Sequence, residues 1–414
     1  MPNSNHMPSG QFIARYFLAA FALVAGSSAG TIENLQDPAR NPGFVYFLNN
    51  EYDQALVYFE DQVKANPDDS KQYNHVAQTI LYRELFRNGA LESQLVGSSN
   101  AFLKRPKLEM AAADRQHFRD CIRKAIAMNE ACLRSNPRDV KALYELGVAH
   151  GLQANYLFLM EKSWVESLRE ASTARKLQER VLEMDPQFVD ARLILGVYQY
   201  AIGCLPFYMR ALGFVGGFHG SKEGGLRQLQ LVASNGVLNR YDAKVLLAVL
   251  YRREHEPQQA IPLLQELSRQ FDHNYLFRFE QVQMYSDLGD KASAFAVLAD
   301  IEKRRRAGAP GYETLRAEKV QYVTGNLHFR YGDLDSALQD LKQATGHPDE
   351  LDSSTAVIAW LRLGQVYDLQ GDRQQAISAY RTSMKIAPAS GIAEEAKGYI
   401  NNPYKKKAKG DRKG

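Results

Sequence analysis

The segment from Val357 to Pro388 carries a spaced set of residues that strongly restricts what the chain can fold into. The set combines aromatic, aliphatic and very small side chains at helical spacing: Trp360, Leu363, Gly364, Tyr367, Ala376, Tyr380 and Pro388. Gly364 and Ala376 allow two antiparallel helices to approach closely, and the larger side chains fill the space around that contact. One such hairpin cannot bury its own apolar face, so it requires similar hairpins stacked on it.

Weaker copies of this pattern occur along most of the chain. The small residues Ala260 and Ala294 follow Gly225 at separations of 35 and 34 residues, and an earlier copy is centred on Ala55. We therefore expect an all-α solenoid of about eight antiparallel helix pairs over residues 43–403. The helix expected over residues 390–400 has one apolar face and would cap the last hairpin.

Two stretches interrupt the repeat, and we interpret them as insertions at about residues 88–110 and 201–225. Only Arg210 is charged between Leu193 and Phe218, which leaves three alternatives for the second insertion: a buried structural segment, an apolar surface for lipid or ligand, or a membrane span. Residues 30–42 form a polar lead-in, Arg304–Arg306 begin a linker, and residues 404–414 form a basic tail that we expect to be disordered.

The N-terminus has the features of a targeting segment. Arg15 precedes the apolar run at residues 16–25, and small residues follow at Ser27 to Ala29. We expect residues 1–29 to be a cleaved signal peptide, with an uncleaved membrane anchor as the alternative. The protein would then be exported to the periplasm or associated with the bacterial cell envelope.

Charge and cysteine content limit the possible partners. The net charge is +4, but the tail from Lys405 carries five Lys, one Arg and one Asp, or +5, so the rest sums to about −1. We expect no nucleic-acid partner. Lys405, Lys406 and Lys407 could contact an anionic surface or serve solubility alone. Cys121 and Cys132 are too far apart on one helix to be bridged, and we expect buried, reduced thiols.

The sequence lacks the motifs of common catalytic and metal sites. It contains no H-E-x-x-H, no G-x-S-x-G, no Walker-type phosphate loop and no C-x-x-C pair. His150 and His328 stand where Tyr367 stands in the clearest repeat, so we interpret both as structural. We expect no enzymatic activity, no cofactor and no metal.

By the residues of Val357–Pro388, the chain resembles the tetratricopeptide repeat (TPR) family. That resemblance implies a concave wall, lined by the first helix of each pair, that binds a peptide or partner protein. Carried over by spacing from the small residue of each repeat, the wall would comprise Asn74, Gln78, Tyr82, Tyr144, Arg252, Arg253, Tyr322, Asn326 and Arg330.

Two further likenesses are more limited. Residues 205–226 are similar to a segment of the inclusion-body-clearance group of TPR proteins, and the expected export suggests an analogy with bacterial TPR proteins that work beside solute transporters. We interpret the chain as a non-catalytic scaffold for a protein or peptide partner. The alternative is a carrier or membrane-associated protein that holds an apolar ligand or lipid through residues 201–225. The oligomeric state is left open.

Overall fold

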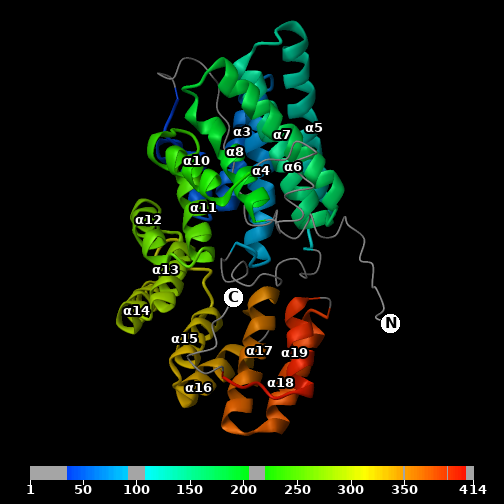
Figure 1. Cartoon of the computed structure of the whole chain (residues 1–414). Coiled ribbons are helices and arrows are strands. Elements are labelled where there is room, and N and C mark those ends of the chain that lie inside the picture. The colour runs from blue at the N-terminus through cyan, green and yellow to red at the C-terminus, as the bar shows by residue number, and fades with distance from the viewer. Residues whose placement is uncertain (1–34, 92–107, 205–219, 348–349, 389, 407–414) are drawn as a thin grey trace, which may run out of the picture. The chain divides into compact units, whose positions relative to one another are not determined.

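The structure is a computed structural model that describes residues 35–91, 108–204, 220–347, 350–388 and 390–406. Over these residues every regular element is helical, and antiparallel helices follow one another in pairs (Figure 1). The contacts divide the chain into two compact units. The first unit comprises residues 1–84 and 107–274, and the second comprises residues 85–106 and 275–414.

The described residues form eight helical hairpins, as the repeat spacing predicts. The first five are α2 (Pro42–Leu48) with α3 (Tyr52–Ala65), α4 (Ser70–Arg87) with α5 (Ala112–Ser135), α6 (Val140–Tyr156) with α7 (Trp164–Met184), α8 (Arg192–Gly203) with α10 (Lys222–Asn235), and α11 (Arg240–Arg253) with α12 (Pro257–Gln270). A 3-10 turn, η3 (Pro38–Arg40), precedes them, a π-helical turn (Leu157–Glu161) extends α6, and η6 (Val189–Ala191) precedes α8.

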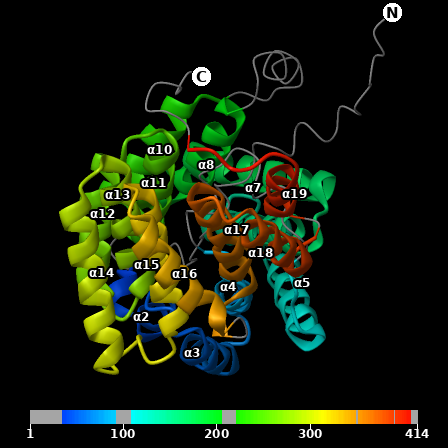
Figure 2. The same ribbon diagram turned by 90° about the horizontal axis from the view of Figure 1, so that it is seen from below.

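The last three hairpins belong to the second unit, where Figure 2 shows them in chain order. They are α13 (Tyr275–Leu288) with α14 (Lys291–Arg306), α15 (Ala317–Tyr331) with α16 (Leu334–Gly346), and α17 (Ser353–Gln370) with α18 (Arg373–Ile386). The expected capping helix is α19 (Gly391–Asn401), which packs on α18. The predicted all-α solenoid is thus confirmed.

Short polar side chains begin many of these helices. At each such start, a carboxylate or hydroxyl oxygen accepts a hydrogen bond from a backbone N–H of the first turn; in the second half of the chain these residues are Asp290, Asp333, Asp352, Asp372 and Ser390. These bonds satisfy amide groups that have no partner inside the helix. Gly332 and Gly371 end α15 and α17 with φ of 87° and 84°, a conformation that glycine adopts without strain.

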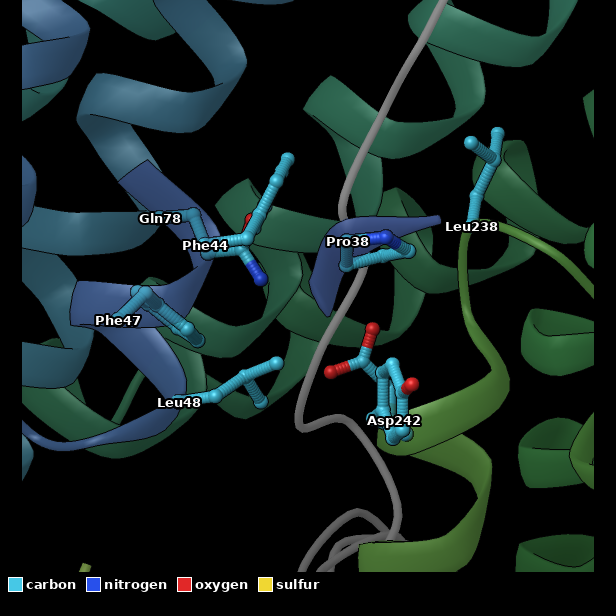
Figure 3. Close-up of a pocket in the computed structure, with 8 residues that line it drawn as sticks. Pro38, Phe44, Phe47, Leu48, Gln78, Leu238 and Asp242 are labelled. Carbon is cyan, nitrogen blue, oxygen red and sulfur yellow. The ribbon is translucent and has the colours of Figure 1, made fainter. Parts of the chain in front are cut away.

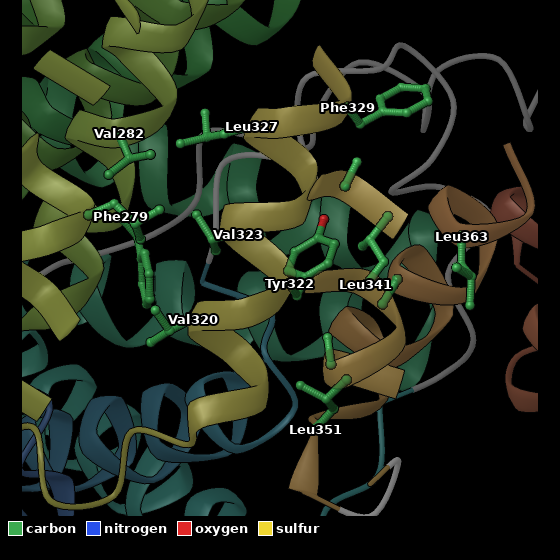
Figure 4. Close-up of a cluster of buried hydrophobic side chains, with 14 of the residues drawn as sticks. Phe279, Val282, Val320, Tyr322, Val323, Leu327, Phe329, Leu341, Leu351 and Leu363 are labelled. Carbon is green, nitrogen blue, oxygen red and sulfur yellow. The ribbon is translucent and has the colours of Figure 1, made fainter. Parts of the chain in front are cut away.

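The core of the second unit lies where its first helices meet each other and α16. Phe279 and Val282 of α13, Val323 and Leu327 of α15, and Leu341 of α16 belong to one buried cluster (Figure 4). Tyr322, only 1% exposed, is part of the same cluster. The apolar faces that no single hairpin could bury are therefore covered by the neighbouring hairpins.

The first unit closes on itself through contacts between its two ends. Asn274 donates a hydrogen bond to the carbonyl oxygen of Leu48 at 2.8 Å, and Asn50 donates to Asn274 Oδ1 at 2.7 Å. His273 Nδ1 lies 2.7 Å from Glu51 Oε1. The turn of the first hairpin is thereby joined to the segment that follows the fifth.

Several local expectations need correction. Arg304–Arg306 are not a linker but the last turn of α14, because Arg304 pairs with Asp300 while Arg305 and Arg306 pair with Glu302. Cys121 is buried as expected, but Cys132 is exposed. The expected signal peptide and most of both insertions lie outside the described residues.

Candidate functional site

The nine residues predicted for a concave wall are divided between the two units. Asn74, Gln78, Tyr82, Tyr144, Arg252 and Arg253 lie in the first unit, and Tyr322, Asn326 and Arg330 in the second. Asn74, Gln78, Tyr82, Tyr144 and Tyr322 are at most 3% exposed. These five side chains therefore form interior contacts in this conformation, and only the remaining four reach solvent.

Asn74 on α4 illustrates how the interior of the first unit is built. Its Nδ2 donates to the carbonyl oxygen of Glu145 at 3.1 Å and to Glu145 Oε2 at 2.9 Å. Burial raises the pKa of Glu145 to about 7, against the opposing effect of the bond from Asn74. Two neighbouring first helices, α4 and α6, are thus joined by polar groups rather than separated by a groove.

A second buried polar network lies around Tyr144 of α6. Asn239, which precedes α11, donates from Nδ2 to the Tyr144 hydroxyl at 2.9 Å and to the Asp190 carbonyl oxygen at 3.1 Å. Asp190 in turn accepts the backbone N–H of Asn239 at 2.8 Å and that of Val237 at 3.1 Å. Tyr144 therefore has a structural contact that spans three successive hairpins.

Gln78 lines a narrow recess in the first unit. The other lining residues are Pro38, Phe44, Phe47, Leu48, Leu238, Tyr241 and Asp242. Figure 3 shows the Asp242 carboxylate directed toward Pro38 and Leu48. Gln78 Nε2 has no hydrogen-bond partner in the described part of the chain. The recess is too narrow to admit a water molecule, so it is a packing feature and not a ligand cavity.

Arg252 and Arg253 end α11 and are partly exposed. The next residue, Glu254, accepts hydrogen bonds from Lys222 Nζ at 2.9 Å and from the Tyr200 hydroxyl at 2.5 Å. Glu254 thus joins the two helices, α8 and α10, that flank the second insertion. The lipid-carrier alternative rests on residues 201–225, of which 205–219 lie outside the described residues.

In the second unit, α15 presents two of its predicted residues to solvent. Asn326 is half-buried and Arg330 is exposed. Arg330 Nη2 forms an ion pair with Asp287 Oδ1 of α13 at 2.6 Å, so adjacent first helices share a polar edge. Within the second unit, these two residues are the part of the predicted wall that is accessible.

Three further residues on this side of the second unit were missed by the spacing argument. Phe329 and Asp368 each stand four residues after the small residue of their helix, Gly325 and Gly364. Both contact Tyr404, which the sequence analysis assigned to a disordered tail. The repeated offset of four could have identified Phe329 and Asp368, but nothing in the sequence joins Tyr404 to them.

The second unit also contains a cavity of about 200 Å³. It lies where the segment after α4 meets the starts of α13, α15 and α17, and its lining includes Tyr275, Leu276, Lys319 and Leu351. Lys319 Nζ is paired with Asp352 at 3.1 Å and also bonded to Thr355. Because Lys319 and Asp352 neutralise each other, neither of these two side chains presents an unpaired charge to the cavity.

The histidines expected to be structural have carboxylate partners on the second helix of their own hairpins. His150 Nδ1 lies 2.5 Å from Glu170, and His328 Nδ1 lies 2.7 Å from Asp340. Among the described residues, no group of three or more His, Cys, Asp or Glu side chains is arranged to bind a metal. Within those same residues, every helix is too short or too polar to cross a bilayer.

Over the described residues, successive helical hairpins with a capping helix define an α-solenoid built from helical-hairpin repeats. Residues 357–390 match the family model described as tetratricopeptide repeat. The chain therefore contains a tetratricopeptide repeat, and proteins built from such repeats generally act as scaffolds that bind other proteins. None of the curated proteins matches the chain significantly.

Solved structures similar to the chain include the Cut9–Hcn1 hetero-tetramer of the APC/C, with 13% identity and a TM-score of 0.40 over 87% of this chain and 63% of that one. YrrB, a TPR protein with an unusual peptide-binding site, matches with 16% identity and a TM-score of 0.30 over 65% and 97%. The human IFIT1 dimer with PPP-AAAA matches with 13% identity and a TM-score of 0.44 over 95% and 85%. These likenesses are too distant to indicate what the chain binds.

Proposed function

We propose that the protein is an exported scaffold of the bacterial cell envelope that binds a protein partner along the first helices of its second unit. The observation that carries this proposal is the accessible polar edge formed by Asn326, Arg330 and Asp287 on adjacent first helices. Repeat proteins of this kind use such extended surfaces for binding. Four of the six predicted wall residues of the first unit, Asn74, Gln78, Tyr82 and Tyr144, are buried, which favours the second unit as the docking surface.

Asn326 and Arg330 offer chemistry suited to an extended peptide. An amide side chain both donates and accepts hydrogen bonds, and it can pair with peptide backbone. Arg330 presents a planar group of N–H donors that matches a carboxylate, and Asp287 holds that group toward α13. A partner carboxylate could replace Asp287 as the acceptor, which makes the ion pair a replaceable contact.

Site-specific photocrosslinking tests the surface. A photoreactive amino acid replaces Asn326 in the full-length protein, expressed in its own cells, and a matched variant carries it at the exposed Lys342 of α16. We expect a discrete adduct from position 326, absent from position 342, and lost when Arg330→Glu is added. Equal labelling from both positions, or an adduct that persists in Arg330→Glu, would refute this docking surface.

Export is tested separately from binding. Cell fractionation followed by N-terminal sequencing should place the mature protein in the periplasm or envelope, with a new N-terminus near residue 30. Recovery of the intact N-terminus in the cytoplasm would remove the envelope from the proposal and leave the scaffold role to be judged by the crosslinking.

A further inference from the structure

The chain's own C-terminal segment is packed on the first helices of the second unit. Asn402 leaves α19 in an extended conformation with φ of −131° and ψ of 111°, and Pro403 prevents the helix from continuing. In Figure 1 the red segment after α19 runs past α17 toward α15. Tyr404 is partly buried, while Asn402, Pro403, Lys405 and Lys406 are exposed. The segment is therefore extended, and Tyr404 is the one residue of it that is partly buried.

The main chain of this segment is bound by Asp368 of α17. The backbone N–H of Tyr404 donates to Asp368 Oδ2 at 2.7 Å. The Asp368 side chain is 0% exposed and is held in place by the Tyr380 hydroxyl and by Arg373 Nη1, each at 2.7 Å. A buried carboxylate fixed by two other donors is thus positioned to accept a peptide N–H, a charge-assisted bond that depends little on the peptide's sequence.

Aromatic rings bind the side chain of Tyr404. Its ring centroid lies 5.9 Å from that of Phe329 and 5.2 Å from that of Tyr399, the latter in an edge-to-face arrangement. Arg362 lies over the Phe329 ring at 4.4 Å, and Arg373 Nη2 donates to the Tyr399 carbonyl oxygen at 2.7 Å. These contacts hold the Phe329 and Tyr399 rings in place independently of Tyr404. The two rings form two walls of an aromatic site.

Lys406, the second of the two lysines that follow, lies toward the acidic turn of the neighbouring hairpin. Lys406 Nζ lies 3.3 Å from the point where a side chain at Gly332 would begin, and Asp333 and Asp335 come directly after that glycine turn. Both lysines are exposed. The site therefore combines a backbone acceptor, an aromatic slot and a nearby acidic turn, in the order in which an extended peptide would meet them.

We propose that Asp368, Phe329 and Tyr399 form a binding site for an extended peptide carrying an aromatic residue followed by basic residues. The chain's own residues 402–406 occupy this site in the free protein, and a partner segment of the same chemistry displaces them. The inference rests on the proposed scaffold function and names the partner chemistry that one part of the docking surface recognises.

Reversibility follows from how little of the segment is bound. One backbone hydrogen bond and one aromatic side chain hold it, and the flanking side chains are in solvent. A tethered segment competes at an effective concentration in the millimolar range for short linkers, so a free peptide should bind an emptied site more tightly than the occupied one.

The test uses the full-length chain and a labelled peptide with the sequence of residues 401–406, Asn-Asn-Pro-Tyr-Lys-Lys. Fluorescence anisotropy is measured with the wild-type protein and with Tyr404→Ala, whose own segment lacks the anchor. We expect the peptide to bind Tyr404→Ala at least tenfold more tightly than wild type. Equal affinity for both proteins, or no binding to a Tyr404→Ala protein with wild-type circular dichroism, would overturn the proposal.

Peptide variants identify which contact is responsible without altering the protein. Replacing the peptide tyrosine by alanine, or methylating its backbone nitrogen, should each weaken binding at least tenfold, because one removes the ring and the other removes the donor to Asp368. Phenylalanine at that position should bind as tyrosine does. If the alanine peptide binds as well as the tyrosine peptide, the aromatic slot is not the site.

A measurement on the wild-type protein does not depend on how any variant folds. Hydrogen exchange at the Tyr404 amide should accelerate when saturating peptide is added, and the alanine peptide should leave it unchanged. An unchanged rate with the tyrosine peptide would mean that the segment is not displaced. Crosslinking from position 326 that persists alongside such a negative result would leave the proposed function intact and remove only this inference.

Discussion

Asp242 on α11 is a carboxylic acid whose surroundings do little to stabilise its charged form. It is 4% exposed, it faces apolar side chains, and no hydrogen bond to its side chain is present in the described part of the chain. Burial, and secondarily the nearby Asp190, raise the pKa of Asp242 to about 8 from an ordinary value of 3.8. The folded protein therefore binds a proton at Asp242 that the unfolded chain releases near pH 4.

The consequence is a loss of stability as pH rises. Between about pH 4 and pH 8 the folded state binds more protons than the unfolded state, so the free energy of unfolding falls with pH, by at most about 1.4 kcal/mol per pH unit from this group. Asp242→Asn mimics the protonated acid and should remove that dependence. We expect urea unfolding to give similar stabilities for variant and wild type at pH 4.5 and a more stable variant at pH 8.

The exposed Asp68 in the same unit provides the matched control. Asp68→Asn should follow the wild-type pH dependence throughout this range. A difference between Asp242→Asn and wild type that stays constant from pH 4.5 to pH 8 would show that Asp242 is ionised in the folded protein.

Within each hairpin, the small residues of the repeat pattern allow the two helices to approach closely. A side-chain carbon added at Gly364 of α17 would lie 2.5 to 3.0 Å from three atoms of the Tyr380 ring on α18. That ring cannot easily move, because its hydroxyl is bonded to Asp368 and its face packs near Tyr399. By contrast, an added carbon at Gly398 of α19 would meet nothing within 4 Å.

Two glycine-to-alanine substitutions in the second unit should therefore have opposite signs. Gly364→Ala should lower the free energy of unfolding by about 1–3 kcal/mol, since it overpacks the contact between α17 and α18. Gly398→Ala should raise it by about 0.5–1 kcal/mol, because alanine favours the helix and no clash opposes it. Urea unfolding followed by Trp360 fluorescence, in a Trp164→Phe background, measures both. Equal effects at the two positions would contradict the close approach in this hairpin.

At the scale of the whole molecule, local periodicity predicted the repeats themselves but not how they are arranged. The spacing from Ala55 to Ala376 predicted the eight hairpins, and the apolar face after Pro388 predicted α19. The accessibility of the wall did not follow, since Asn74 and Gln78 occupy the expected face yet are buried. Whether such a face is open depends on contacts between residues far apart in the chain, which a repeat of 34 residues does not encode.

The closure of the first unit is such a contact. Asn274 and Asn50 are 224 residues apart, and each donates to the other's side-chain oxygen. Asn50 has a φ of 62°, which places it in the left-handed region that asparagine tolerates better than most residues. The turn between α2 and α3 thus directs the side-chain amide of Asn50 toward Asn274, at the end of the unit.

Asn274→Ala tests whether this contact stabilises the first hairpin. The substitution leaves the buried carbonyl of Leu48 without its side-chain donor, which should cost about 1–3 kcal/mol. Because α2 has only seven residues, it depends on such packing to remain folded. Hydrogen exchange of the Asn49 and Glu51 amides, bonded to Val45 and Tyr46, should accelerate in the variant. The exposed Asn235 of α10 is the control, and Asn235→Ala should leave those amides unchanged. Unchanged exchange in Asn274→Ala would mean that the first hairpin holds its fold without the far end of the unit.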